Sequence, residues 1–328
     1  MKKQLTLISA LSLLVLAGVS KDLLIHLKSG EELTFTTDKV DQVRFSGSIG
    51  DAEMPEDPYP SATDFSHKVL LMDHTGTDCG NCPIVTSAFR QLEADDAYSS
   101  SYTLAALHSY AGDPMGNAMI RAVSGAYMNG TGWPYVSVNL TKTGDGAYAN
   151  IEKTTDAIRA LIDGQQNMTV SGVAANAKLD GNTLNLSLSV KAGENGNYGV
   201  GAFVIEDGIV AEQTNLHPDV TGDADFNTHN NVVRAIVGRQ TDGTCPGIEL
   251  GSIVKGETAT TSQSITLSDS WKLENCRLIL YVTEEVDGKY VCVNSAYAPP
   301  QRRDSLRIRF GSSCHRQLRD SREEYGRV

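Results

Sequence analysis

The sequence predicts an α+β multidomain chain, in which an α/β domain is followed by an antiparallel β-sandwich. Residues 66–166 alternate strand-like and helix-like patterns, which is typical of an α/β domain. Residues 167–298 instead hold a series of short strand-like segments separated by turn residues, as in a sandwich. The composition agrees, because aromatic residues make up only 6% of the chain and its 30 glycines favour many turns over long helices.

The first 20 residues have the features of a secretory signal. Lys2 and Lys3 precede an apolar stretch over residues 5–18, which is shorter than the about 20 residues that a spanning helix needs. The run Leu16-Ala17-Gly18 resembles a lipoprotein cleavage box, but Val19 stands where that box requires Cys. We therefore expect a signal peptide over residues 1–20 and export to the cell envelope, without support for lipid anchoring by this route.

A small module and a linker are expected before the α/β domain. In residues 21–48, Ile25, Leu27, Leu33 and Phe35 alternate with polar residues across a Ser-Gly turn, which predicts a β-hairpin. Residues 49–65 are rich in Pro, Ser and acidic residues and are predicted to be a linker.

Within residues 66–166, a continuous apolar run at 68–72 predicts a buried parallel strand. The helical spacing that follows, over residues 85–94, lies just after a turn that carries two cysteines. Further elements are expected as strands at 102–107 and 135–139, an inserted helical and Gly-rich segment at 111–131, and an amphipathic helix at 151–161.

Residues 167–298 are predicted to form an immunoglobulin-like β-sandwich. The clearest signal is a hairpin, in which Asp287-Gly288 separates apolar runs at 278–283 and 290–293. Five further strands are expected at 169–177, 183–191, 198–206, 232–237 and 262–267.

Charge is distributed unevenly along the chain. The net charge is -12, yet residues 299–328 carry eight Arg against four acidic residues, which leaves 20 basic and 36 acidic residues elsewhere. We expect this basic tail to be solvated and disordered. The acidic body argues against a nucleic-acid partner, because phosphates are bound by clusters of Lys and Arg. No phosphate-binding G-x-x-x-x-G-K-S/T loop occurs, so we expect no nucleotide and no other cofactor.

The motif Cys79-Gly80-Asn81-Cys82 carries the strongest chemical signal, because it lies between a buried strand and a helix. A thiolate at a helix N-terminus has a lowered pKa and attacks disulfides, and a second Cys at this spacing can resolve the mixed disulfide. In this context the motif predicts a thioredoxin-like domain. A structural zinc site is disfavoured, since zinc takes four ligands and no second C-x-x-C is present.

Trp133-Pro134 supports the thioredoxin-like interpretation. Such domains place a cis-proline just before a strand that faces the Cys pair, and the residues after Pro134 form a predicted strand. We therefore expect a cis bond and assign Cys79, Cys82 and Pro134 as the candidate site.

Other titratable and oxygen-bearing residues are not assigned to the candidate site. Protonated His74 would favour the Cys79 thiolate and Asp78 would disfavour it, unless solvent screens both. His108 is interpreted as a surface or strand-end residue in preference to a proton-transfer group. The oxygen-rich segment 217–227 is interpreted as an acidic loop in preference to a calcium site. The remaining cysteines allow three full pairings, among which the sequence does not choose: Cys245, Cys276, Cys292 and Cys314.

Four segments together resemble the outer-membrane-protein-28-related family of bacteroidete bacteria: residues 76–83, 131–139, 204–215 and 229–238. The stretch from Glu206-Asp207-Gly208 to His229-Asn230-Asn231 is the most discriminating part. The resemblance spans about residues 68–298 and implies a thioredoxin-like domain followed by a β-sandwich in an envelope-associated protein. It also implies that His229, Asn230 and Asn231 hold a turn and that Arg234 pairs with a loop carboxylate.

Two functions stay open at this point. The first is thiol–disulfide exchange with thiols or disulfides of envelope proteins, in which Cys79 attacks and Cys82 resolves. The second is non-catalytic binding of an extracellular protein ligand, in which the Cys pair is only a structural disulfide. Whether the protein is an enzyme is therefore undecided. In both cases we expect it in the periplasm or at the outer membrane, peripheral to the bilayer.

Overall fold

The computed structural model describes residues 65–130, 132–147, 150–165, 170–222 and 224–298, together with the backbone of five short strands outside these ranges. It is β-rich with few helices, which agrees with the predicted α+β class. The chain divides into two units: residues 53–300 form one, and residues 1–52 with 301–328 form the other. The predicted signal segment, residues 49–64 of the predicted linker and most of the predicted tail lie outside the described residues.

In the smaller unit, the predicted hairpin is confirmed. Strands β1 (Asp22–His26) and β2 (Glu32–Thr36) pair antiparallel, with Ile25 opposite Leu33. Two short strands, β3 (Arg44–Phe45) and β19 (Leu306–Arg307), also pair antiparallel, and β18 is Gln301–Arg302.

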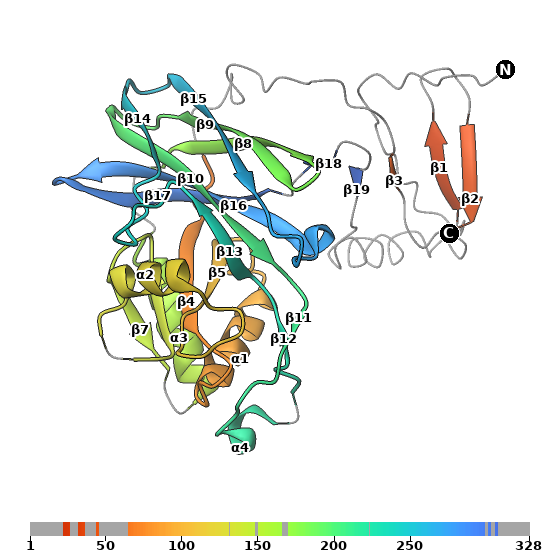
Figure 1. Cartoon of the computed structure of the whole chain (residues 1–328), viewed down its shortest axis with the longest axis vertical. Helices are drawn as coiled ribbons and strands as arrows, with labels where there is room; N and C mark the ends of the chain where they lie inside the picture. The colour runs from red at the N-terminus through yellow and green to blue at the C-terminus, as the bar shows by residue number, and fades with distance from the viewer. Residues whose placement is uncertain are drawn as a thin grey trace, which may run out of the picture. The chain divides into compact units, whose positions relative to one another are not determined.

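The larger unit is built on a nine-stranded sheet with the order β17-β16-β10-β13-β5-β4-β6-β7, and β14 also pairs with β10 (Figure 1). The members from the first half of the unit are β4 (Val69–Thr75), β5 (Tyr102–His108), β6 (Tyr135–Val138) and β7 (Gly144–Gly146). Those from the second half are β10 (Gly196–Glu206), β13 (Val232–Val237), β14 (Ile248–Ile253), β16 (Cys276–Val286) and β17 (Lys289–Ala298).

Parallel and antiparallel pairing both occur in this sheet. Strand β5 pairs parallel with β4 and, more briefly, with β13, where the amide of Ala106 donates to the carbonyl of Asn231 at 2.8 Å. Strand β6 is antiparallel to β4. The sheet therefore continues across residue 166, where the sequence predicts a domain boundary; the predicted boundaries themselves remain predictions.

Three helices cover the β4–β5–β6 part of the sheet: α1 (Cys82–Glu93), α2 (Ala118–Tyr127) and α3 (Ile151–Asp163). Successive side chains of β4 point to opposite faces of the sheet, and each face is covered by different helices. Val69 and Leu71 belong to the same buried cluster as residues of α1 and α3, whereas Leu70 and Met72 pack with residues of α2. Helices α2 and α3 begin at Asn117 and Asn150, whose side chains accept backbone amides as N-caps.

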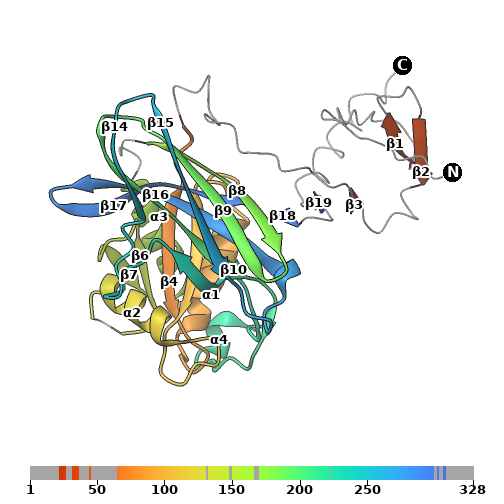
Figure 2. The same cartoon turned by 45° about the horizontal axis from the view of Figure 1, so that its top comes forward.

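A second sheet covers the β10–β16–β17 part. It contains β8 (Gly172–Asp180), β9 (Thr183–Lys191) and β15 (Thr258–Thr266) in the order β15-β9-β8, all antiparallel (Figure 2). Leu184, Leu186 and Leu188 of β9 form one buried cluster with Val200 of β10 and Leu280 of β16. The remaining short elements are β11 (Ile209–Val210), α4 (Pro218–Thr221), β12 (Thr228–His229) and a 3-10 helix at Leu273–Asn275.

Candidate functional site

The Cys loop, residues 76–82, joins the end of β4 to the start of α1. Cys79 and Cys82 form a disulfide with an S–S distance of 2.04 Å. The amides of Cys79 and Cys82 donate to the carbonyls of Gly76 and Cys79, each at 3.1 Å, so the loop is a tight turn that runs into the helix. Pro83 occupies the first turn of α1, where a missing N–H costs nothing.

His74, near the end of β4, is fully buried. Its Nδ1 and Nε2 each lie 2.8 Å from a hydroxyl, of Ser124 and Ser137 respectively. Burial lowers the pKa of His74 to about 3, so the ring is neutral at pH 7. A favourable charge from protonated His74 on a Cys79 thiolate is therefore excluded. Asp78, next to Cys79, is exposed to solvent.

Asp73 is a buried carboxyl within strand β4. It is 6% exposed, and its Oδ1 has no hydrogen-bond partner among the described residues. Burial raises the pKa of Asp73 to about 7. The side chain lines a cavity of about 100 Å³. Other polar residues around this cavity include Thr75, Thr86, His108, Gln213, His229 and Asn231.

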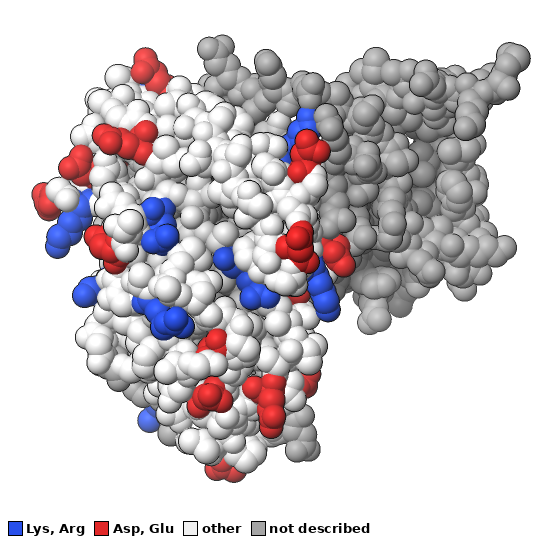
Figure 3. All heavy atoms as spheres, viewed as in Figure 1, with Lys and Arg blue, Asp and Glu red and all other residues white. Residues whose placement is uncertain are grey.

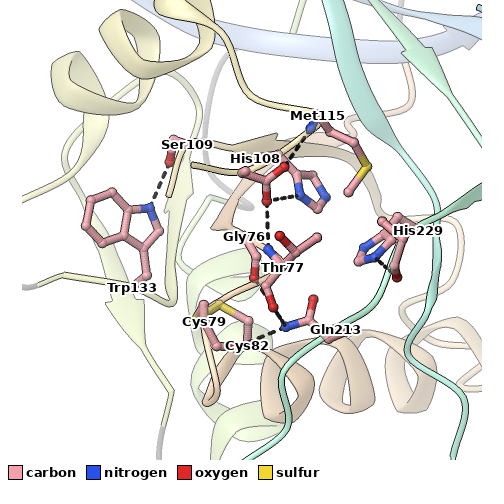
Figure 4. A network of polar contacts seen from close by, with 12 residues as sticks. Gly76, Thr77, Cys79, Cys82, His108, Ser109, Met115, Trp133, Gln213 and His229 are labelled. Carbon is pink, nitrogen blue, oxygen red and sulfur yellow. Dashed lines mark hydrogen bonds and ion pairs between the residues drawn. A yellow bond between two sulfur atoms is a disulfide. The ribbon is translucent and has the colours of Figure 1, made fainter. Parts of the chain in front are cut away.

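His108 ends strand β5, which confirms its interpretation as a strand-end residue, but it is buried and so is not a surface residue. Its Nδ1 lies 2.9 Å from Oδ2 of Asp113, and the same oxygen accepts the amide of Thr77 at 2.7 Å (Figure 4). Burial raises the pKa of Asp113, but hydrogen bonds from His108, Thr77 and Met115 outweigh it and lower that pKa to about 2. His108 and Asp113 thus stabilise the start of the Cys loop through the Thr77 amide. His229 meets His108 edge-on, with ring centroids 5.0 Å apart.

The Trp133–Pro134 peptide bond is cis, as predicted, and Pro134 is buried. Trp133 donates its indole N–H to Oγ of Ser109 at 2.8 Å. The Trp133 ring packs edge-on against Tyr110, whose Cβ would be 2.2 Å from a Cβ added to Gly76. Tyr110 therefore links the Trp133–Pro134 segment to the start of the Cys loop, and only Gly fits at position 76.

A segment that we call the strap, residues 211–217, lies along the Cys loop. The amides of Thr214 and Leu216 donate to the carbonyls of Thr77 and Gly80 at 2.8 and 3.0 Å. Gln213 adds a side-chain amide to the same loop (Figure 4). The sequence did not single out these residues, and the only available signal was that Gln213 lies inside the family-like segment. The predicted loop at 217–227 begins with the short helix α4.

The family-like segment 229–231 forms hydrogen bonds, as the resemblance implied. Oδ1 of Asn230 accepts the amide of Gly208 at 3.0 Å, and His229 bonds to the carbonyl of Ala211 at 3.1 Å. Asn231 has a φ of 59° and accepts a hydrogen bond from Arg277. Arg234 does pair with a carboxylate, that of Glu206 at 2.8 Å, but this residue ends strand β10 and does not lie in a loop.

The three other described cysteines, Cys245, Cys276 and Cys292, are free and buried, so none of the predicted pairings forms among them. Cys314 lies outside the described residues. Within the described ranges, no group of three or more His, Cys, Asp or Glu side chains is placed to hold a metal ion. No helix in this part of the chain is long and apolar enough to cross a membrane.

Charged side chains are mixed on the face shown in Figure 3, where Lys and Arg of the described residues stand among Asp and Glu. Acidic residues of the strap and the segment after it are exposed near the Cys loop, namely Glu212, Asp219 and Asp225.

Solved structures that are similar to this chain include the following two. HBP35 of Porphyromonas gingivalis has a similar structure, with a TM-score of 0.54 and 17% identity over 72% of this chain and 76% of that chain. A domain of the outer membrane lipoprotein Omp28 from Porphyromonas gingivalis gives a TM-score of 0.26 and 12% identity over 40% of this chain and 88% of that chain. No curated protein matches the sequence.

The profile of the family described as outer membrane protein Omp28 matches residues 122–298. The match begins after the Cys loop and includes the strap. Because it covers more than half of the 328 residues, this envelope-associated chain belongs to the outer membrane protein Omp28 family.

Proposed function

We propose that this protein is an exported, thioredoxin-like thiol–disulfide exchange protein of the cell envelope, with a C-terminal immunoglobulin-like sandwich that recruits or presents its substrate. The observation that carries this proposal is the Cys79–Cys82 disulfide at the N-terminus of α1, in a loop that follows the parallel strand β4. Backbone amides and the dipole at this helix end stabilise a thiolate.

In the proposed reaction, the Cys79 thiolate attacks one sulfur of a substrate disulfide and the other substrate sulfur leaves as a thiolate. The Cys82 thiolate then attacks Sγ of Cys79, which releases the second substrate thiolate and restores the protein disulfide. The substrate gains two electrons and the protein loses two; the reverse sequence oxidises a substrate dithiol. Pro134, linked to the loop through Tyr110 and Trp133, would border the substrate chain.

Asp73 is suited to exchange protons in this reaction. Its pKa of about 7 allows it to accept or release a proton near neutral pH. It lines the same cavity as Gln213, whose side chain contacts the Cys79 carbonyl.

A second candidate function is non-catalytic binding of an extracellular protein, with the disulfide as a structural link. The near-complete burial of the pair favours it, because Cys79 and Cys82 are only 4% and 1% exposed. A substrate sulfur could then reach Cys79 only after the strap or the Trp133–Pro134 segment had moved.

The reduction potential of Cys79–Cys82 separates the two functions. It is measured on the full chain by thiol trapping across a glutathione or dithiothreitol series, with a Cys79→Ser, Cys82→Ser double variant as the control for the other thiols. A potential between about -120 and -270 mV supports exchange. A value below about -300 mV identifies a structural disulfide and favours the binding function.

A further inference from the structure

The side-chain amide of Gln213 is surrounded by backbone carbonyls of the Cys loop. Its Nε2 lies 3.2 Å from the carbonyl oxygen of Gly76, 2.9 Å from that of Thr77 and 3.1 Å from that of Cys79 (Figure 4). The carbonyl of Thr214, in the strap itself, is a fourth neighbour at 3.0 Å. An NH2 group has two hydrogens and no acceptor capacity on nitrogen, so it is matched to a site made only of acceptors.

Hydrogen bonds on both sides of Gln213 hold its backbone in place. Asn227, beyond α4, accepts the backbone amide of Gln213 on its Oδ1 at 2.9 Å, and its own carbonyl accepts the amide of Ala211 at the same distance. On the other side, the hydrogen bonds of Thr214 and Leu216 fix the strap to the Cys loop. Gln213 is thus a preorganised donor that reaches the disulfide loop from 134 residues away.

Leu216 shows how closely the strap and the loop fit. A Cβ added to Gly80, between the two cysteines, would lie 2.3 Å from Cγ of Leu216. His217 continues the contact, with Nε2 at 2.6 Å from Oδ1 of Asn81. Every residue of the C-x-x-C turn except Cys82 therefore has a contact with the strap that this structure records.

We propose that Gln213 is a positioning residue for the Cys79–Cys82 couple, which holds the turn in its closed conformation when the two sulfurs are not bonded. The inference rests on the proposed exchange function and names the residue that sets the thiol pair's geometry. In the oxidised protein the covalent bond already orders the loop. In the reduced protein, only non-covalent contacts keep the Cys82 sulfur close to Cys79.

The consequence is a higher effective concentration of Cys82 toward Cys79. In the resolving step, Cys82 as a thiolate attacks Sγ of Cys79, the bond from Cys79 to the substrate sulfur breaks, and the substrate leaves as a thiolate. The rate and equilibrium of this step depend on how often the two sulfurs lie within reach. A loosened loop makes disulfide formation less favourable and therefore makes the couple more oxidising.

The test compares full-length wild type with Gln213→Leu, which removes the donor and leaves an apolar side chain that is one atom shorter. The matched control is Gln263→Leu, on an exposed position of β15. We expect Gln213→Leu to lower the equilibrium constant for disulfide formation against glutathione about tenfold, which raises the potential by about 30 mV. The mixed disulfide between Cys79 and glutathione should also persist about tenfold longer. The control should change neither quantity.

Urea unfolding of the oxidised and reduced forms distinguishes positioning from general stabilisation. By linkage, the change in the free energy of disulfide formation equals the difference between the changes in the free energy of unfolding of the reduced and oxidised forms. The proposal requires that Gln213→Leu lowers the free energy of unfolding of the oxidised form more than that of the reduced form, because the variant makes disulfide formation less favourable. Equal destabilisation, with an unchanged equilibrium constant, would overturn it.

Asn227→Ala provides a second route if Gln213→Leu does not fold. This variant removes the acceptor for the Gln213 amide and leaves the side-chain donor present, so we expect a shift of about two- to threefold in the same direction. No shift would count against the proposal. A wild-type potential below about -300 mV together with the expected variant shifts would overturn the exchange function and leave the positioning role intact.

Discussion

The Cys loop and the buried cluster between the large sheet and α2 contain cysteines in opposite settings. Cys79 and Cys82 lie in a turn that is held by polar contacts from Gln213 and Asp113, and they are bonded to each other. Cys292 and Cys245 are buried among apolar side chains at 0% exposure and remain free. Burial raises the pKa of both free thiols to about 12, and that of Cys276 likewise.

From this difference we expect the surroundings, and not the residue type, to decide which cysteines react. Thiol chemistry needs a thiolate and an approach path, and a helix N-terminus with polar neighbours provides the first of these. An apolar core provides neither, so its cysteines act as small apolar side chains.

The largest expected effect is in thiol reactivity after mild reduction. With a pKa of about 12, roughly one in 10,000 molecules of Cys245, Cys276 or Cys292 is a thiolate at pH 8. We expect iodoacetamide to modify Cys79 or Cys82 at least roughly 1,000-fold faster than these three, as measured by peptide mass spectrometry. Urea-unfolded protein is the control, in which all should react alike. Rapid labelling of any of the three in folded protein would break the comparison.

Asp73→Asn should change how stability depends on pH. The folded pKa of Asp73 is about 7 against an ordinary value of 3.8, so the folded state binds more protons between these values. The free energy of unfolding should therefore fall as pH rises from about 4 to 7, by a contribution on the order of 4 kcal/mol.

Asp73→Asn, which has no proton to lose, should lack this contribution. Urea unfolding of oxidised wild type and variant at pH 5 and pH 8 measures it, and the wild-type-minus-variant difference cancels the other carboxylates. Parallel pH profiles of the two proteins would show that Asp73 titrates as an ordinary carboxyl.

Leu278→Ala should destabilise the core between the two sheets without affecting the disulfide. Leu278 is fully buried in the cluster shared by β9, β10 and β16, and truncating such a side chain costs about 2–5 kcal/mol. Leu216→Ala, at 69% exposure on the strap, should change the free energy of unfolding by less than about 0.5 kcal/mol. Chemical denaturation provides both values. A changed reduction potential in Leu278→Ala would show that the two regions are more closely coupled than their contacts indicate.

Local patterns were sufficient to predict most of the larger unit's elements. Strands β9 and β13 were predicted with their observed bounds, because alternating apolar residues are bracketed by turn residues. Strand β14 was missed, since Gly251 and Ser252 interrupt its apolar pattern. The pairing of β13 with β5 was also missed, because it joins residues far apart in the sequence and leaves no local signal.

The candidate site was predictable only where it is local. The Cys pair and the cis bond before Pro134 follow from short motifs. Gln213 and Asp113 could not be assigned, because their roles depend on side chains that meet the Cys loop from distant segments. The burial of His108 was missed for the same reason: its partner Asp113 lies in an insertion whose path the sequence does not reveal.

The shared sheet affects how this protein can be divided. Strand β5 is bordered by β4 on one side and by β13 on the other. A fragment that ended at residue 166 would present β5 as an open edge, with backbone groups free to pair with another chain. We therefore expect a recombinant fragment of this kind to aggregate. For the same reason, the C-x-x-C segment and the Omp28-matched segment need to be expressed together as one chain.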